Sequence, residues 1–207
     1  MKLDTAILQF KKIHNTFAIC VALLASGVSH AAVKHWKIIP TQSSVQFLAT
    51  GKPGFLRFKG EGAKIEGQAT LDGSKLTGDF EVKLDSITTG IDLRDEHMKT
   101  KYLETGKFPA AKLSLNPLII DPTNKALEQP FTGKLTIKGV EKPVSGKFTV
   151  AFTTTSDEVA TGQASLKLNL SDYPVGVPSH LGVTVAESIV VSVNFVASPL
   201  EAETLLK

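Results

Sequence analysis

Arg94, Asp95 and His97 form the most site-like polar cluster of this 207-residue chain. A guanidinium and an imidazole this close together could donate hydrogen bonds to the polar head group of a ligand, or act as electrostatic and acid–base partners in a reaction. The alternative is structural, because an aspartate in the first turn of a helix and an adjacent arginine need no ligand to explain them. We favour helix capping plus a local ion pair, and we keep Arg94 and His97 as candidate head-group contacts.

Metal binding and catalysis have weaker support in the sequence. His35, His97 and His180 are each isolated, without a Cys, His or Glu at the spacing of metal ligands. The sequence has no Gly-x-Ser-x-Gly elbow and no pair of carboxylates on an apolar face. We therefore predict no metal, no cofactor, no catalytic residue and no enzymatic activity.

Alternation of apolar and polar residues is the strongest structural signal, and residues 76–86 show it best. Leu76, Phe80, Val82 and Leu84 fall on one face, and charged residues fall on the other. This period of two predicts a strand with one buried and one wet face. The same pattern recurs in segments around residues 45–49, 63–71, 113–115, 131–137, 144–152, 164–170 and 189–195.

These segments, with a lead-in at residues 36–38, predict eight or nine antiparallel strands around a single core. Such strands can stack as a sandwich or close as a barrel, and closure removes exposed edges. Asp72-Gly73-Ser74 and residues 138–143 are predicted hairpin connections. Inward positions include several glycines, and alternation by itself does not distinguish a filled interior from a cavity.

Residues 92–104 break the alternation and predict one short helix. Asp92 is placed to cap it, and Gly106 followed by Pro109 ends it. Met98 and Tyr102 share a face with Arg94, which leaves Lys99 and Lys101 toward water. Residues 171–187 are expected to form a long loop with one helical turn.

Residues 1–31 have the pattern of a cleaved secretory signal peptide. Three lysines precede an apolar run at residues 17–28, and Ser29-His30-Ala31 supplies small residues for cleavage. The rival interpretation is a buried N-terminal helix or an uncleaved anchor. We expect a mature domain at 32–207, located in the periplasm or secreted.

Cleavage would remove three lysines and one aspartate and lower the formal net charge from +3 to +1. It would also remove Cys20, the only cysteine. A near-neutral domain gives no electrostatic argument for a nucleic-acid partner. No further apolar run approaches the length of a membrane span, so stable membrane insertion is not expected.

Several motifs together resemble the YceI-like family of bacterial lipid-binding proteins. They span most of the mature chain: Trp36, Ser44–Phe47, Ser86–Gly90, Arg94–Met98, Phe108-Pro109, Phe131–Val144 and a closing strand that ends at Phe195. Family members often carry a histidine just before the first long strand, where this chain has Ser43. The resemblance implies an all-β, lipocalin-like barrel of about eight strands, exported and often dimeric, that holds a polyisoprenoid, an isoprenoid quinone or another long-chain amphiphile.

The candidate lipid contacts are apolar residues of the inward faces, of the glycine-flanked segment 53–58 and of the expected helix. They are Phe47, Phe55, Phe58, Phe80, Val82, Leu84, Met98, Tyr102, Leu113, Leu115, Phe148 and Phe195. The leading hypothesis is a carrier or sequestering protein for a lipid-like small molecule. The alternatives are a lipid-modifying enzyme that uses the same cavity and a structural secreted barrel with a filled core.

Overall fold

The computed structural model describes residues 33–52, 54, 56–121, 127–153, 158–177, 179–180 and 183–200. The expected signal peptide and the candidate residue Phe55 lie outside them. The strands are β1 (Lys34–Ile38), β2 (Ser44–Lys52), β3 (Arg57–Asp72), β4 (Lys75–Lys83), β5 (Ala110–Ile119), β6 (Gln129–Ile137), β7 (Val140–Phe152), β8 (Ala160–Asn169), β9 (Ser179–His180) and β10 (Val183–Pro199).

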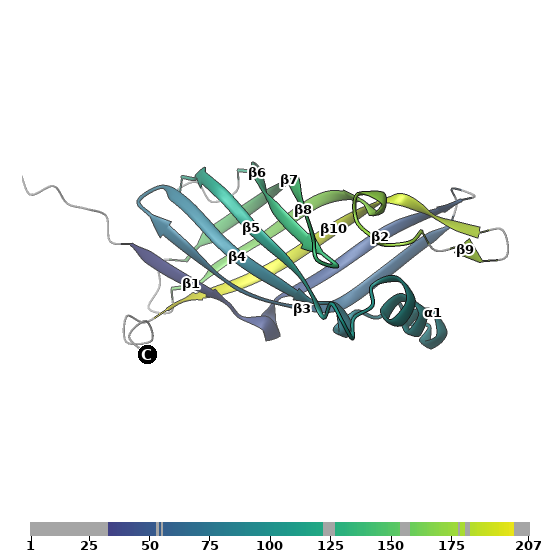
Figure 1. The fold of residues 1–207 in the computed structure, drawn as a ribbon. Coiled ribbons are helices and arrows are strands. Elements are labelled where there is room, and N and C mark those ends of the chain that lie inside the picture. The colour runs from purple at the N-terminus through teal and green to yellow at the C-terminus, as the bar shows by residue number, and fades with distance from the viewer. Residues whose placement is uncertain are drawn as a thin grey trace, which may run out of the picture. The chain divides into compact units, whose positions relative to one another are not determined.

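Eight antiparallel strands close into a barrel (Figure 1). Strands β2 to β8 pair in chain order, and β10 pairs with both β8 and β2 to complete the ring. The predicted barrel of about eight strands is therefore confirmed, with a single α-helix in the described chain, α1 (Asp92–His97), after β4.

Strands β1 and β2 occupy the same place in the barrel. Both lie between β10 and β3, and the short helix η1 (Pro40–Gln42) separates them. At this break the Ser43 hydroxyl accepts a hydrogen bond from Val196 N at 3.0 Å and lies 3.3 Å from Val196 O. Ser43 therefore bridges the interrupted ladder.

Tight turns set the register of two hairpins. Gly73, with a φ of +60°, turns β3 into β4 within the predicted Asp72-Gly73-Ser74 loop. The β6–β7 connection is shorter than predicted, because only Lys138 and Gly139 separate the strands. Both have positive φ, +50° and +77°, the geometry of a two-residue hairpin turn, and Val140 to Pro143 belong to β7.

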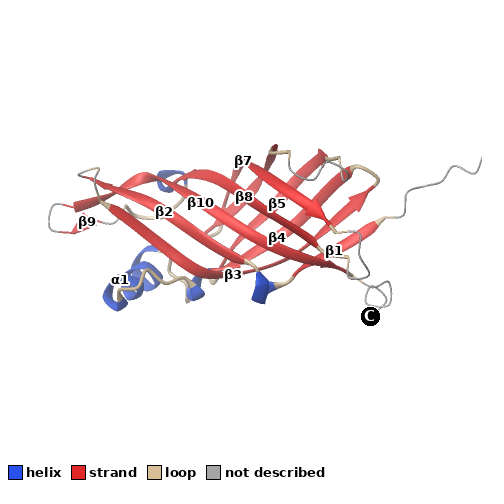
Figure 2. Cartoon of the chain, turned by 180° about the vertical axis from the view of Figure 1, so that it is seen from behind, coloured by secondary structure: helices blue, strands red, loops and turns tan. Residues whose placement is uncertain are grey.

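The helical segment is divided. Regular helix α1 ends at His97, and Met98–Tyr102 continue as the π-helical turn η3, in which Leu103 N bonds Met98 O at 2.8 Å. The expected cap at Asp92 is wrong: Ile91 holds the cap position without a side-chain bond, and Asp92 lies inside the helix. The segment lies at one end of the barrel and β1 at the other (Figures 1 and 2).

The stretch 171–187 is only partly a loop. One short helical turn, η4 (Leu170–Asp172), is present as expected. Beyond it, Thr184 and Ser179 pair as β9 folds back on β10, which begins at Val183. No helix among the described residues is long and apolar enough to cross a membrane.

Candidate functional site

Asp95 holds the start of α1 to the loop that leads into it. Its carboxylate accepts hydrogen bonds from Thr88 Oγ1 at 2.5 Å, from Thr89 N at 2.7 Å and from Thr89 Oγ1. Burial by itself raises the pKa of Asp95, but the bonds from Thr88 and Thr89 outweigh it and the pKa lies below its ordinary value. Asp95 is therefore a charged anchor of the loop.

Arg94 reinforces the same anchor. Its Nε donates to Thr89 Oγ1 and its Nη2 to Thr89 O, both at 2.7 Å. The expected fastening of the helix is present, but it runs through Thr89 and not through an Arg94–Asp95 ion pair. The guanidinium also lies 5.7 Å from the ring centre of Phe58, within cation–π range. Arg94 thus joins α1 to β3.

A second contact holds the end of the segment to the β6–β7 turn. The Lys138 side chain is only 8% exposed, and its Nζ lies 2.6 Å from Glu104 Oε1 and 3.1 Å from Tyr102 O. Lys138, and then Lys107, hold the pKa of Glu104 below its ordinary value. Both ends of the helical segment are therefore fixed to the barrel.

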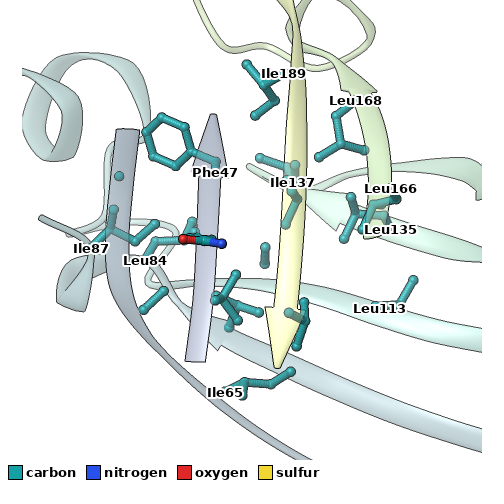
Figure 3. Close-up of a pocket in the computed structure, with 18 of the residues that line it drawn as sticks. Phe47, Ile65, Leu84, Ile87, Leu113, Leu135, Ile137, Leu166, Leu168 and Ile189 are labelled. Carbon is teal, nitrogen blue, oxygen red and sulfur yellow. The ribbon is translucent and has the colours of Figure 1, made fainter. Parts of the chain in front are cut away.

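The barrel encloses a cavity of about 890 Å³. Apolar side chains from β2, β3, β5, β6, β8 and β10 turn toward one space (Figure 3). The cavity reaches from Trp36, Ala160 and Ala197 at the β1 end to Leu93 and Arg94 at the α1 end. Trp36 pairs with Ala69 on β3, eleven residues beyond Phe58, so the lining follows about 36 Å of this strand, which at the usual tilt of a barrel strand is roughly 30 Å along the barrel axis.

Charge is confined to one end of this cavity. Among the described residues that line it, the side chains that can carry a positive charge are Arg94, His97 and Lys101, all on the α1–η3 segment, and none of the described lining residues is a carboxylate. Thr89 adds a hydroxyl there, and Gln46 adds an amide on β2. Lys101, expected toward water, is exposed but also lines the cavity, since it follows Arg94 by two helical turns. The site is an apolar channel with a polar rim.

A family model for the YceI-like domain matches residues 36–197, most of the chain and nearly all of the barrel. The chain belongs to the YceI-like family. No curated protein matches it in sequence.

Solved structures of similar proteins share the YceI-like fold. A polyisoprenoid-binding domain from Saccharophagus degradans is 14% identical, with a TM-score of 0.60, over 80% of this chain and 98% of that one. Burkholderia cenocepacia BcnA is 20% identical, with a TM-score of 0.62, over 78% and 99%. The Campylobacter jejuni YCEI protein is 18% identical, with a TM-score of 0.56, over 70% and 85%. At these identities the likeness supports the fold.

The structure brings the sequence-predicted residues of this YceI-like barrel together around one space. One of the twelve apolar candidates, Phe55, lies outside the described residues, and the other eleven line the cavity: Phe47, Phe58, Phe80, Val82, Leu84, Met98, Tyr102, Leu113, Leu115, Phe148 and Phe195. Arg94 and His97 lie at its α1 end. Their contact with a ligand stays a prediction.

Inward glycines of the YceI-like barrel are covered by phenylalanine rings from the neighbouring strand. Four register pairs share this arrangement: Phe47 with Gly60, Phe80 with Gly67, Phe131 with Gly146, and Phe195 with Gly162. A Cβ added to any of these glycines would come within 2.1–2.6 Å of the ring. The rings therefore lie against the wall over the glycines, and the centre of the barrel stays open.

Sequence reasoning missed lining residues outside the clearest alternation. Trp36 and Ile38 come from the short strand β1, and Tyr173 and Val175 come from the irregular segment after η4. Burial, and then Asp172, raise the pKa of Tyr173, and its hydroxyl lies 3.4 Å from Leu135 O. The alternation at residues 36–38 was a signal for Trp36 and Ile38, whereas no local pattern marks Tyr173 and Val175.

Proposed function

We propose that this YceI-like protein binds one long-chain amphiphile inside the barrel and carries or sequesters it without changing it. The candidate ligands are a polyisoprenoid, an isoprenoid quinone or a fatty-acid derivative. The observation that carries the proposal is the apolar cavity of about 890 Å³, in which the charged groups among the described lining residues all lie at one end. Ligand cavities of this kind commonly have volumes of 300–1,000 Å³.

The cavity dimensions favour a slim, extended occupant. A volume of about 890 Å³ spread over roughly 30 Å leaves a mean cross-section of only about 30 Å². Removing apolar surface from water contributes about 25 cal/mol per Å², so a long chain gains affinity along its whole length. The fold likeness to a domain described as polyisoprenoid-binding adds support for this ligand class.

Binding without chemistry is also part of the proposal. The Arg94 guanidinium already donates two hydrogen bonds to Thr89 and lies over Phe58, which suits an anchor better than an electrostatic catalyst. His97 is exposed at the cavity rim. Conversion of a bound lipid over time would favour the enzyme alternative.

Export belongs to the proposal as well, with the periplasm or the extracellular space as the place of action. It rests on the basic, apolar and small-residue pattern of residues 1–31. The exported product should begin at or within two residues of Ala32 and should lack a thiol, because Cys20 leaves with the signal peptide. Intact mass measures both, and a product that retains residues 1–31 would contradict this part.

Native mass spectrometry followed by organic extraction tests the binding proposal. Wild-type protein should release a long-chain amphiphile unchanged. Ala63→Phe should lower the amount per mole of protein, because Ala63 is buried against the cavity and the new ring enters the channel. Lys64→Phe is the matched control, since it places the same ring on the exposed outer face. Equal lipid content in all three proteins would contradict binding in this cavity.

A further inference from the structure

Trp36 presents a buried donor that has no acceptor in the described part of the chain. The residue is 3% exposed and lines the cavity at the β1 end, yet its Nε1 has no hydrogen-bond partner among the described residues. Buried indole N–H groups ordinarily find a partner, because an unmade hydrogen bond leaves the desolvation cost of the group uncompensated. The second such atom, the hydroxyl oxygen of Ser188, is not on the cavity.

The polar groups at the opposite, α1 end of the cavity are not left unsatisfied in this way. The polar groups of the α1 end are engaged with the protein or lie in water: Arg94 donates to Thr89, and Lys101 and His97 are exposed. A ligand head group is therefore not needed there to satisfy a buried atom. The unsatisfied donor lies about 30 Å away, past the apolar length of the channel.

We propose that the bound amphiphile enters head first, and that a neutral acceptor oxygen on its head accepts a hydrogen bond from Trp36 Nε1. Its hydrocarbon chain then runs back along the channel toward α1. This inference rests on the proposed function and adds the orientation and the head-group class. It names a carbonyl, ether or hydroxyl oxygen as the recognised group.

The surroundings of Trp36 select a neutral head over a charged one. Its lining neighbours at this end are apolar, among them Ile38, Ala69 and Phe152, whose ring centre lies 5.3 Å from that of the indole. A carboxylate or phosphate here would lose its hydration, and no cation lines this end of the cavity among the described residues. A ketone or quinone carbonyl needs only the one donor.

The test uses three probes of equal chain length: 2-heptadecanone, heptadecane and heptadecanoate. Affinity is measured by displacement of the apolar fluorophore N-phenyl-1-naphthylamine from the purified protein. The ketone should bind about five- to tenfold more tightly than heptadecane, the difference expected for one net hydrogen bond. Heptadecanoate should bind more weakly than the ketone.

Trp36→Phe removes the donor and keeps an aromatic ring. Because the smaller ring also changes packing, the measured quantity is the ratio of ketone to heptadecane affinity in each protein, which cancels effects common to both probes. The ratio should fall to one or below in Trp36→Phe, because the ketone carbonyl then loses its water without gaining a donor. Val193→Ala, a truncation elsewhere on the cavity wall, is the control and should leave the ratio unchanged.

The wild-type protein also allows a test of the Trp36 hydrogen bond that needs no variant. Trp36 is the only tryptophan, so the ¹⁵N-labelled protein has a single indole N–H cross-peak. The ketone should move its proton downfield relative to the heptadecane complex. An indole signal that is the same with both probes would overturn the inference. So would a signal that stays shifted upfield, because the N–H would then point at the Phe152 ring.

Two further outcomes separate this inference from the function on which it rests. If none of the three probes displaces the fluorophore, the proposed function fails and the orientation fails with it. If all three bind but heptadecanoate binds best, the cations of the α1 end hold the head group. That result would overturn the head-first orientation and leave amphiphile binding intact.

Discussion

The ring of Phe47 occupies the position that a side chain on Gly60 would need. The two residues are direct partners across β2 and β3, and an added Cβ at Gly60 would lie 2.1 Å from Phe47 Cε1. The three atoms nearest to that Cβ all belong to the Phe47 ring. At Gly146 the added Cβ would also meet a backbone atom, Ser165 O, at 2.4 Å.

This difference predicts opposite outcomes for two glycine substitutions. Gly60→Ala should push the Phe47 ring into the cavity, and therefore lower retained lipid while the melting midpoint stays near that of the wild type. Gly146→Ala should lose about 1–3 kcal/mol of stability, because the backbone cannot move as a ring can. Thermal melts and lipid extraction on both variants check this. Equal destabilisation by the two would show that the Phe47 ring has no room to move.

Enlarging Met98 should obstruct the α1 end of the cavity. Met98 lines the cavity on the π-helical turn, so Met98→Trp should reduce bound lipid and leave the melting midpoint near wild type. Thr100→Trp is the control, since Thr100 is exposed on the same turn and does not line the cavity. Unchanged lipid content with a clear fall in the midpoint would place Met98 in ordinary core.

The two faces of β4 should respond differently to changes in charge. Phe80→Asp places a carboxylate in the apolar cavity, which costs several kcal/mol, and should abolish folding or solubility. Glu81→Gln removes a surface ion pair in which Lys83 Nζ lies 2.6 Å from Glu81 Oε1, and should cost at most about 1 kcal/mol. Soluble yield and thermal melts distinguish them. Similar behaviour of the two variants would contradict the orientation of this strand.

Acid should loosen the helical segment and release the ligand. Native-state pKa values of Asp95 and Glu104 lie below their ordinary values of 3.8 and 4.5. Both carboxylates therefore stabilise the fold fully above the ordinary values, and they lose that contribution as the pH falls through the native ones. Lipid retention should therefore fall as the pH is lowered below the ordinary value of 4.5 and on through the lower native pKa values.

A pair of variants assigns this acid response to the helical segment. Glu104→Gln weakens the contact with Lys138 and should already retain less lipid at neutral pH. Glu128→Gln breaks the 3.0 Å surface pair with Lys147, outside the cavity lining, and should behave as wild type. Identical retention curves for the two variants would show that the anchor at Glu104 does not control the α1 end.

Local sequence pattern was enough to predict antiparallel strands and the face on which each side chain lies, whereas the resemblance to the YceI-like family implied that the strands close into a barrel. Alternation placed Phe80 and Val82 inward and Glu81 outward, since a strand turns successive side chains to opposite faces wherever it lies. The dense helix formers after Gly90 predicted a helix where α1 lies. Its details differ from the pattern: Thr88 and Thr89 engage Asp95, and Ile91 holds the cap position expected for Asp92.

The open interior was decided by tertiary structure. Inward glycines are equally compatible with a filled core and with a cavity, because period-two alternation fixes the face of a residue and not the volume that faces it. Whether the interior is open depends on pairs such as Phe47 and Gly60, in which a ring lies over an inward glycine. Only the register between strands creates such pairs. The lack of an acceptor for Trp36 Nε1 in the described part of the chain was likewise decided by tertiary structure. Hydrogen-bond satisfaction is set by residues distant in the chain, so the donor that we propose to recognise the ligand becomes visible only in the closed barrel.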